Sequence, residues 1–167
     1  MKSKPTDLDA VDVRLLNLLQ DDASLTNQQL AEAAHLSTAT CHRRVRRLQE
    51  AGWIERQVAI VSVDRLRQAQ ACGLHALVEV TLEVQTQEAM ARFETQAVLD
   101  AAVQQCWRVS PGPDFMLVLL VDDMAGYQAV AQRLFTAAWG VRNVRTFFAI
   151  QRAKFSTTVP VRLPATP

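Results

Sequence analysis

The chain has 167 residues, 49% of them hydrophobic and 21% charged, which suits one or two small globular domains and excludes a disordered protein. Its formal net charge is only +1, so it is no general polyanion binder, and any affinity for nucleic acid must come from a local basic patch. The three cysteines lie far apart without a CxxC pairing, which indicates neither a disulfide framework nor a zinc site.

The N-terminal residues lack the apolar core of a signal peptide. The longest apolar run, residues 115–121, is far too short to span a bilayer. We therefore expect a cytoplasmic protein with no membrane partner, and nothing in the sequence indicates a cofactor or a metal ion.

The first predicted element is an amphipathic helix over residues 8–20, preceded by a frayed arm over residues 1–6. Leucine and valine side chains recur on one side of this helix. Aspartates lie near its N-terminal end, where they complement the helix dipole. We expect it to support the helices that follow.

Residues 26–52 predict two short helices joined by a tight turn. Thr26 and Gln29 form a capping box at the start of the first helix. Ser37 supplies the N-cap of the second helix, which ends at Gly52. This arrangement is typical of a helix-turn-helix unit.

The second of these helices has two different faces. Cys41, Val45 and Leu48 share a narrow sector of the helical wheel and predict a buried stripe. The opposite arc is cationic and begins with small residues, as a helix requires if its start is to approach base edges in the major groove. An arginine run alone usually indicates a solvated surface, but the capped helix and short turn before it favour DNA binding. The predicted DNA-binding residues are Ser37, Thr38, Ala39, Thr40, His42, Arg43, Arg44, Arg46 and Arg47.

Residues 53–63 are rich in β-forming residues and predict a short two-stranded wing. Three helices and a wing make residues 1–63 a winged helix-turn-helix domain that binds double-stranded DNA. Residues 64–73 are polar and end in glycine, so we interpret them as a hinge linker.

The spacing of apolar residues changes in the second half of the chain. Alternation over residues 75–84 predicts a strand. The remaining elements are a helix over 86–98, strands over 103–109 and 115–121, a helix over 124–138 and a strand over about 144–150. This order, βαββαβ, is the ferredoxin-like split, so the predicted fold class is α+β, with residues 74–155 as the second domain. Residues 156–167 form a tail that is expected to be loose after Pro160.

Both helices of such a domain cover one face of its sheet. The strands over 115–121 and 144–150 carry apolar residues on both faces, so the uncovered face should be apolar. We therefore expect this domain to form a dimer.

The chain resembles the leucine-responsive regulatory protein/AsnC (Lrp/AsnC) family of transcription regulators over about residues 8–155. The matching pieces are weak singly and specific as an ordered set. They are Leu8-Asp9 with Asp12 and Leu15-Leu16, Leu30-Ala31, Leu36-Ser37 with Cys41 and residues 44–48, Gly52 and Ile54, Val109-Ser110 with Asp114-Phe115, and Gly140-Val141 with Arg145-Thr146.

The resemblance implies a DNA-binding domain followed by a domain that senses a small effector, usually an amino acid, and assembles dimers and often octameric rings. The effector lies at an interface between dimers, beside the loop that joins the second and third strands. The effector residues that the resemblance implies are Ser110, Pro111, Gly112, Asp114, Arg145 and Thr146. Asp114 helps to hold the effector's ammonium group or orders the loop that does, or it merely begins the strand and caps the turn. Packing is the favoured role of Arg145 and Thr146.

Two positions depart from the family pattern. His35 stands where the family usually has a glycine in the turn between the paired helices, and a left-handed backbone there is tolerated by histidine at some cost. Pro111 stands in a glycine position of the effector loop, where it removes a backbone donor. Gly112 restores some freedom one residue later.

Two alternatives to an effector-responsive regulator stay open. One is an architectural protein that bends DNA without an effector, which Pro111 supports. The other is an enzyme like the haem-pathway decarboxylases that share this two-domain layout. Against an enzyme, the three histidines are scattered, and the sequence has no carboxylate pair, nucleophile elbow, P-loop or cluster with metal-ligand spacing. We therefore predict no catalytic residues.

Overall fold

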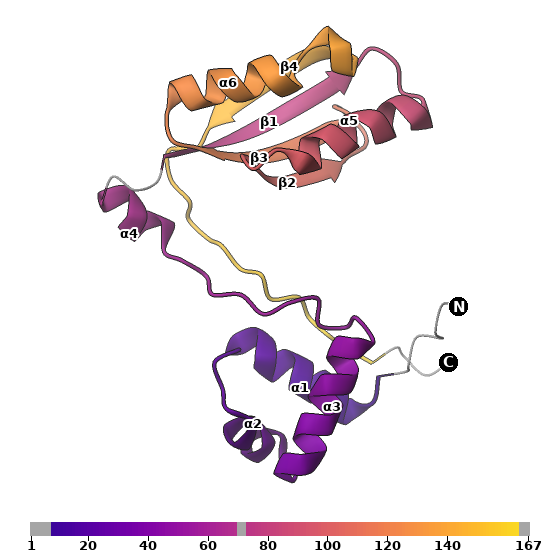
Figure 1. The fold of residues 1–167 in the computed structure, drawn as a ribbon, viewed down its shortest axis with the longest axis vertical. Helices are drawn as coiled ribbons and strands as arrows, with labels where there is room; N and C mark the ends of the chain where they lie inside the picture. Colours follow the sequence, from indigo (N-terminus) through magenta and orange to yellow (C-terminus); the bar gives the residue numbers. More distant parts are fainter. Residues whose placement is uncertain (1–7, 70–72, 164–167) are drawn as a thin grey trace. The chain divides into compact units, whose positions relative to one another are not determined.

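The computed structural model of the protein describes residues 8–69 and 73–163. The chain divides into two compact units, shown in Figure 1. We call them the N-terminal unit, which ends at Ile60 and includes the returning segment from Lys154, and the C-terminal unit, Val61–Ala153. In the described residues, no helix combines the length and the apolar character needed to cross a membrane.

The described part of the N-terminal unit contains α1 (Ala10–Asp21), α2 (Asn27–Ala34) and α3 (Thr38–Glu50). The capping box predicted for α2 is confirmed, because Gln29 Oε1 accepts from the backbone N–H of Thr26 at 2.9 Å and Thr26 Oγ1 accepts from that of Gln29 at 3.3 Å. Ser37 Oγ caps α3 by accepting from the backbone N–H of Thr40, also as predicted. These caps satisfy donors that a helix start otherwise leaves unpaired.

The turn between α2 and α3 has the predicted left-handed backbone. His35 has φ 56° and ψ 48° and ends α2. Leu36 N–H donates to the carbonyl of Ala31 at 2.8 Å, and His35 N–H to that of Glu32 at 3.1 Å, which closes the last turn of the helix. This closure brings Ser37 into place at the start of α3.

A small core holds the three helices together. The predicted stripe of α3 is largely confirmed: Cys41 and Leu48 are buried, and Val45 is partly buried. The buried apolar residues of this core are Leu15, Leu16, Leu30, Ala31, Ala34, Cys41 and Leu48. On the other side of α3, His42, Arg43 and Arg46 are exposed.

The predicted two-stranded wing is not formed. Residues 53–62 contain no strand, and the side chains of Trp53, Val58 and Ile60 are exposed. β-forming residues make strands only when a partner strand supplies cross-strand contacts, and residues 53–62 include no Asn-Gly or Asp-Gly turn to fold them into a hairpin. The predicted hinge is also not simply a linker, since the short helix α4 (Val63–Gln68) begins there with Ser62 as its N-cap; residues 70–72 lie outside the described residues.

The C-terminal unit confirms the predicted βαββαβ order. Its described elements after α4 are β1 (Leu74–Leu82), α5 (Gln87–Leu99), β2 (Val103–Arg108), β3 (Phe115–Val121), α6 (Met124–Leu134), the short 3-10 helix η1 (Ala137–Trp139) and β4 (Val141–Phe148). The four strands are antiparallel in the order β2-β3-β1-β4. Figure 1 shows α5 and α6 on the same face of this sheet. The helix expected over 124–138 ends earlier than predicted, at Leu134.

The two faces of the sheet differ in burial. On the helix-covered face, alternate residues of β1 and β3 are buried, and Phe93 of α5 packs on Phe115 with ring centroids 4.9 Å apart. On the open face, the side chains of Leu77, Trp107 and Phe147 are 40%, 60% and 46% exposed. The sheet therefore leaves an apolar surface uncovered, as the sequence predicts.

The described part of the C-terminal tail is not loose. Gln20 of α1 holds the backbone of Val159 through two hydrogen bonds, with its Nε2 donating to the carbonyl at 3.0 Å and its Oε1 accepting from the N–H at 2.8 Å. Asn17 Nδ2 donates to the carbonyl of Val161 at 3.5 Å, and the Val161 side chain packs against the core of the N-terminal unit. The sequence around Pro160 carries no local signal for this contact, because its partner lies 139 residues earlier.

Candidate nucleic-acid interface and effector loop

The start of α3 presents the small and cationic residues that the sequence indicates. Ser37, Thr38 and Ala39 are exposed, so the first turn of α3 carries no bulky side chain. His42 and Arg43 follow on the same exposed surface. Thr40 is half-buried, and its hydroxyl accepts from Ser37 Oγ at 2.8 Å. Thr40 therefore takes part in the N-cap of α3 as well as in its surface.

Arg46 extends this surface by one turn. Its Nε donates to Glu50 Oε1 at 2.8 Å, and the two side chains are 71% and 64% exposed. An ion pair between such exposed side chains is worth only about 0–1 kcal/mol, so Arg46 can exchange Glu50 for another acceptor at little cost. Arg43 and Arg46 are therefore the two predicted arginines that are exposed to solvent on α3.

The other two predicted arginines of α3 bind α1. Arg44 Nη1 donates to Asp9 Oδ2 at 2.7 Å and to Asp12 Oδ1 at 2.9 Å. Arg47 Nη2 pairs with Asp12 Oδ2. Two of the four predicted guanidinium groups therefore already have carboxylate partners, which the sequence does not indicate.

Asp12 is the residue of this cluster that sequence reasoning missed. Its side chain is fully buried, and its Oδ2 also accepts from the backbone N–H of Asp9 at 3.1 Å. Sequence reasoning assigned it to the helix dipole alone. The shared three-residue spacing of Asp9 with Asp12 and of Arg44 with Arg47 was the available signal, because it places each pair on one face of its helix.

The electrostatics of the cluster favour its charged form. The backbone N–H of Asp12 lowers the pKa of Asp9 below its ordinary value, and Arg44 lowers it further. Hydrogen bonds to Asp9 and Asp12 raise the pKa of Arg44. Arg44 Nε is buried without a hydrogen-bond partner among the described residues.

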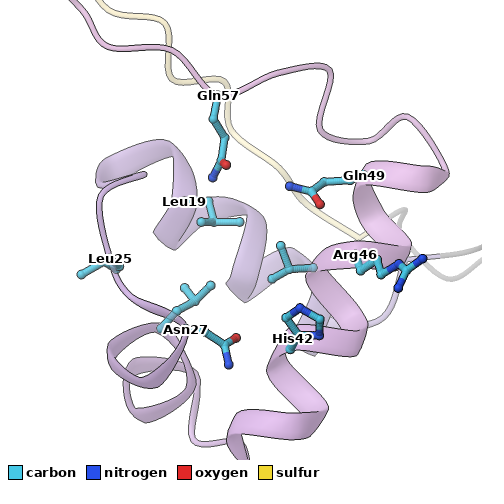
Figure 2. A pocket seen from close by; sticks show the side chains of 9 residues that line it. Leu19, Leu25, Asn27, His42, Arg46, Gln49 and Gln57 are labelled. Carbon is cyan, nitrogen blue, oxygen red and sulfur yellow. The ribbon is translucent and has the colours of Figure 1, made fainter.

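A hollow of about 450 Å³ lies beside the exposed surface of α3. Figure 2 shows side chains from all three helices of the unit and Gln57 around it. Its apolar lining comes from Leu19, Leu25, Leu30 and Val45, and its polar lining from Asn27, His42, Arg46, Gln49 and Gln57. This hollow contains none of the predicted effector residues, and its lining includes His42 and Arg46, two of the predicted DNA-binding residues.

The predicted effector loop joins β2 to β3 and is held by Asp114. Asp114 Oδ2 accepts from the backbone N–H of Leu82 at 2.7 Å and from Gln85 Nε2 at 3.4 Å, and its own N–H donates to the carbonyl of Val80 at 2.9 Å. Asp114 therefore ties the loop to the end of β1. Of the roles considered for this carboxylate, these hydrogen bonds are those of a group that orders the loop.

The tip of the loop is open. Ser110, Pro111 and Gly112 are exposed, and the Ser110-Pro111 peptide bond is cis. Gly112 has φ 122°, a left-handed conformation that side chains other than glycine rarely adopt. The loop thus presents a stretch of backbone without large side chains.

Arg145 and Thr146 lie on opposite faces of β4. Arg145 is on the open face, where its Nε and Nη2 donate to both carboxylate oxygens of Glu79 at 2.7 and 2.8 Å. Thr146 is on the helix-covered face, where its hydroxyl lies 2.6 Å from that of Tyr127. Because β1 separates β4 from β3 in the sheet, one chain does not bring these two side chains together with Asp114.

Comparison with protein families identifies both units. The sequence profile described as "Winged helix-turn-helix DNA-binding" matches residues 8–55. The profile described as "Lrp/AsnC ligand binding domain" matches residues 75–159. The first match contains the whole of α1, α2 and α3, and the second contains the loop that Asp114 holds.

Relatives of known role align over nearly the whole chain. The Bkd operon transcriptional regulator of Pseudomonas aeruginosa is 34% identical over 155 residues, which cover 93% of this chain and 99% of that protein. The DNA-binding transcriptional activator DecR of Escherichia coli is 32% identical and covers 92% and 99% of the two chains. The leucine-responsive regulatory protein of Escherichia coli is 30% identical and covers 96% of each.

Solved structures share the fold of both units. An AsnC family transcriptional regulator from Agrobacterium tumefaciens has a TM-score of 0.80 and 29% identity over 92% of this chain and 97% of its own. A transcriptional regulator from Neisseria meningitidis in complex with L-methionine has a TM-score of 0.79 and 25% identity over 92% and 96%. With its helix-turn-helix unit and its ligand-binding unit both matched, this chain belongs to the Lrp/AsnC family of DNA-binding transcriptional regulators and not to a family of enzymes.

Proposed function

We propose that this regulator reads its operator with the exposed surface of α3 and responds to an amino acid bound beside the loop of residues 110–114. The observation that carries the first part is the exposure of a small first turn followed by His42, Arg43 and Arg46 on a capped helix. Arg44 and Arg47 are left out of this interface, because carboxylates of α1 hold their guanidinium groups.

The geometry of α3 suits the major groove of DNA. Thr38 and Ala39 are small, so the start of the helix can come close to base edges. Arg43 and Arg46 are three residues apart and therefore project from the same side of the helix. A guanidinium group in this position can donate two hydrogen bonds to the O6 and N7 atoms of guanine or to a phosphate.

Substitution of these arginines tests the interface. Arg43→Ala or Arg46→Ala should weaken operator binding by about 1–3 kcal/mol if the guanidinium contacts a base. Arg142→Ala removes an exposed arginine from the C-terminal unit and should leave operator affinity unchanged. Fluorescence anisotropy with a duplex selected by the wild-type protein from a random pool measures all three. Unchanged affinity in both α3 variants would assign DNA reading to another surface.

The effector proposal is supported by the ligand-binding domain match and by the related Neisseria meningitidis regulator, which is in complex with L-methionine. The loop of residues 110–114 offers exposed backbone groups, and Asp114 keeps that backbone in one place. Within one chain Arg145 and Thr146 lie apart from this loop, because their own strand lies beyond β1, so any contact they make with the effector comes from another copy of the chain.

Thermal unfolding in the presence of each of the twenty amino acids tests this part, because a ligand that binds only the folded state raises the apparent melting temperature. Asp114→Ala should abolish the shift that the effector produces while operator binding remains. An effector response that survives intact in this variant would place the pocket elsewhere. No shift with any of the twenty would favour the DNA-architectural alternative, which Pro111 supports by removing a backbone donor from the loop.

We also propose that the open face of the sheet joins two copies of the chain. Its exposed apolar side chains, including Leu77, Trp107 and Phe147, form the kind of surface that monomers rarely leave in water. Dimers would then associate further, up to octamers, in the cytoplasm, where the operator DNA lies. Light scattering should show a dimer or larger particle for the wild type and a smaller one for Leu77→Glu. An unchanged particle size in that variant would exclude this face.

A further inference from the structure

The arginines of α3 divide into two pairs with different surroundings. Arg43 and Arg46 are exposed to solvent. Arg44 and Arg47 lie against α1, where a single carboxylate, that of Asp12, binds both of them. The Asp12 side chain has no exposed surface, whereas that of Arg47 is 41% exposed. Arg47 is therefore a cation at the edge of the proposed interface whose counter-charge lies inside the protein.

Asp12 engages its partners through both carboxylate oxygens. Oδ1 accepts from Arg44, and Oδ2 accepts from Arg47 and from the backbone N–H of Asp9. Arginine binds phosphate and carboxylate oxygens with the same planar donor geometry. A buried carboxylate in this position therefore occupies donors of Arg47 that a DNA phosphate would otherwise attract.

We propose that Asp12 is a positioning residue of the DNA interface, because it withholds Arg47 from the DNA backbone and so weakens sequence-independent binding. This inference rests on the proposed function, in which the exposed surface of α3 meets DNA. Contacts between cations and phosphates supply nearly all of the affinity for non-specific DNA, whereas contacts to base edges distinguish sequences. Holding one cation back lowers the sequence-independent part of the affinity and leaves the base contacts in place.

Arg47, and not Arg44, is the cation that Asp12 controls. The side chain of Arg44 is 24% exposed, and its bond of 2.7 Å to Asp9 would remain if Asp12 lost its charge. In the described residues, the ion-pair partner of Arg47 is Asp12. Neutralising Asp12 would therefore release Arg47 into solvent and leave Arg44 in place.

The variant Asp12→Asn tests the proposal, since it keeps the shape and one acceptor of the side chain and removes its charge. Full-length protein is titrated by fluorescence anisotropy against two duplexes at a series of NaCl concentrations. One duplex is selected by the wild-type protein from a random pool, and the other is its scrambled sequence. We expect the variant to bind the scrambled duplex about 2- to 10-fold more tightly at low salt, with a slope of log K against log [NaCl] steeper by about 0.9, as one added phosphate contact requires.

Two further variants assign this effect to Arg47. Arg47→Gln alone should leave the salt slope unchanged, because its guanidinium contacts no phosphate in the wild type. The double variant Asp12→Asn/Arg47→Gln should return the slope to the wild-type value. Arg43→Gln in the same assay should weaken binding to the selected duplex.

Several outcomes would overturn the inference. If Asp12→Asn weakens binding to both duplexes equally with an unchanged slope, Asp12 only supports the fold. If Arg47→Gln flattens the slope, Arg47 already contacts DNA. If circular dichroism shows that Asp12→Asn does not fold, the comparison of Arg47→Gln with Arg43→Gln still shows whether Arg47 contacts DNA in the wild type. If Arg43→Gln also leaves DNA binding unchanged, the proposed interface on α3 is wrong. This result distinguishes failure of the proposed function from failure of the inference about Asp12.

Discussion

The two units of this regulator close their cores in different ways. The C-terminal unit covers one face of a sheet with two helices, and its core of aliphatic side chains and two aromatic rings contains no buried charge among the described residues. The core of the N-terminal unit is smaller, includes the buried carboxylate of Asp12 and receives Val161 from the far end of the chain. A small helical unit exposes more of its surface for each buried residue, so it depends more on polar contacts and on segments that are distant in sequence.

The largest effect is expected from a substitution in the apolar core of the C-terminal unit. Phe115→Ala removes a fully buried ring that packs on Phe93. It should lower the free energy of unfolding of the C-terminal unit by about 3–5 kcal/mol, because the lost contacts leave a cavity. Hydrogen exchange measured by mass spectrometry should show faster exchange in β1 and β3 and unchanged protection in α3. Equal loss of protection in α3 would mean that the two units unfold as one.

A smaller effect is expected from removal of the buried carboxylate in the N-terminal unit. Asp12→Ala leaves Arg44 and Arg47 without their shared partner and the backbone N–H of Asp9 without an acceptor. The N-terminal unit should lose about 1–3 kcal/mol, the usual cost of removing hydrogen bonds to a charged group when water can reach part of the site. Here exchange should rise in α1 and α3 and stay constant in β1. A variant as stable as the wild type would show that the carboxylate does not contribute to the stability of this unit.

The contribution of the returning tail is expected to be smaller still. Val161→Ala removes part of a side chain that packs on the N-terminal core and should cost about 0.5–1 kcal/mol. Val159→Ala is the matched control: its side chain is 62% exposed, and its contacts with Gln20 are made by the backbone. Urea denaturation of the two variants measures the difference, and equal stabilities would exclude an anchoring role for Val161.

The smallest effect is a dependence of stability on pH. Asp9 has a pKa below its ordinary value of 3.8 in the folded protein, because of the backbone N–H of Asp12 and the guanidinium of Arg44. Its contribution to stability is therefore fully present above pH 3.8 and is lost as the pH falls through the lowered, folded-state pKa. Asp9→Asn should flatten the loss of protection of α1 on acidification. Glu79, whose pKa Arg145 lowers, should give the same sign in the C-terminal unit.

The sequence by itself determined the features that depend on neighbouring residues. The caps at Thr26 and Ser37 and the left-handed turn at His35 each involve hydrogen bonds within five residues, so the chain order alone predicts them. The βαββαβ order is also predicted by the sequence, because the spacing of apolar residues that distinguishes a strand from a helix is a property of each short segment. The covering of one sheet face by both helices then follows, because it is common to this topology.

The tertiary structure decided which partners the distant groups find. Residues 53–62 have the composition of a wing, but no strand pairs with them. The C-terminal tail binds α1 through a hydrogen bond between residues that are 139 positions apart in the sequence. By sequence the arginines of α3 form one cationic surface, yet a carboxylate 35 residues before Arg47 pairs with that arginine. Composition and period specify which faces are apolar or charged, but a charge pairs with the group that packing brings within reach, and only the folded chain defines that group.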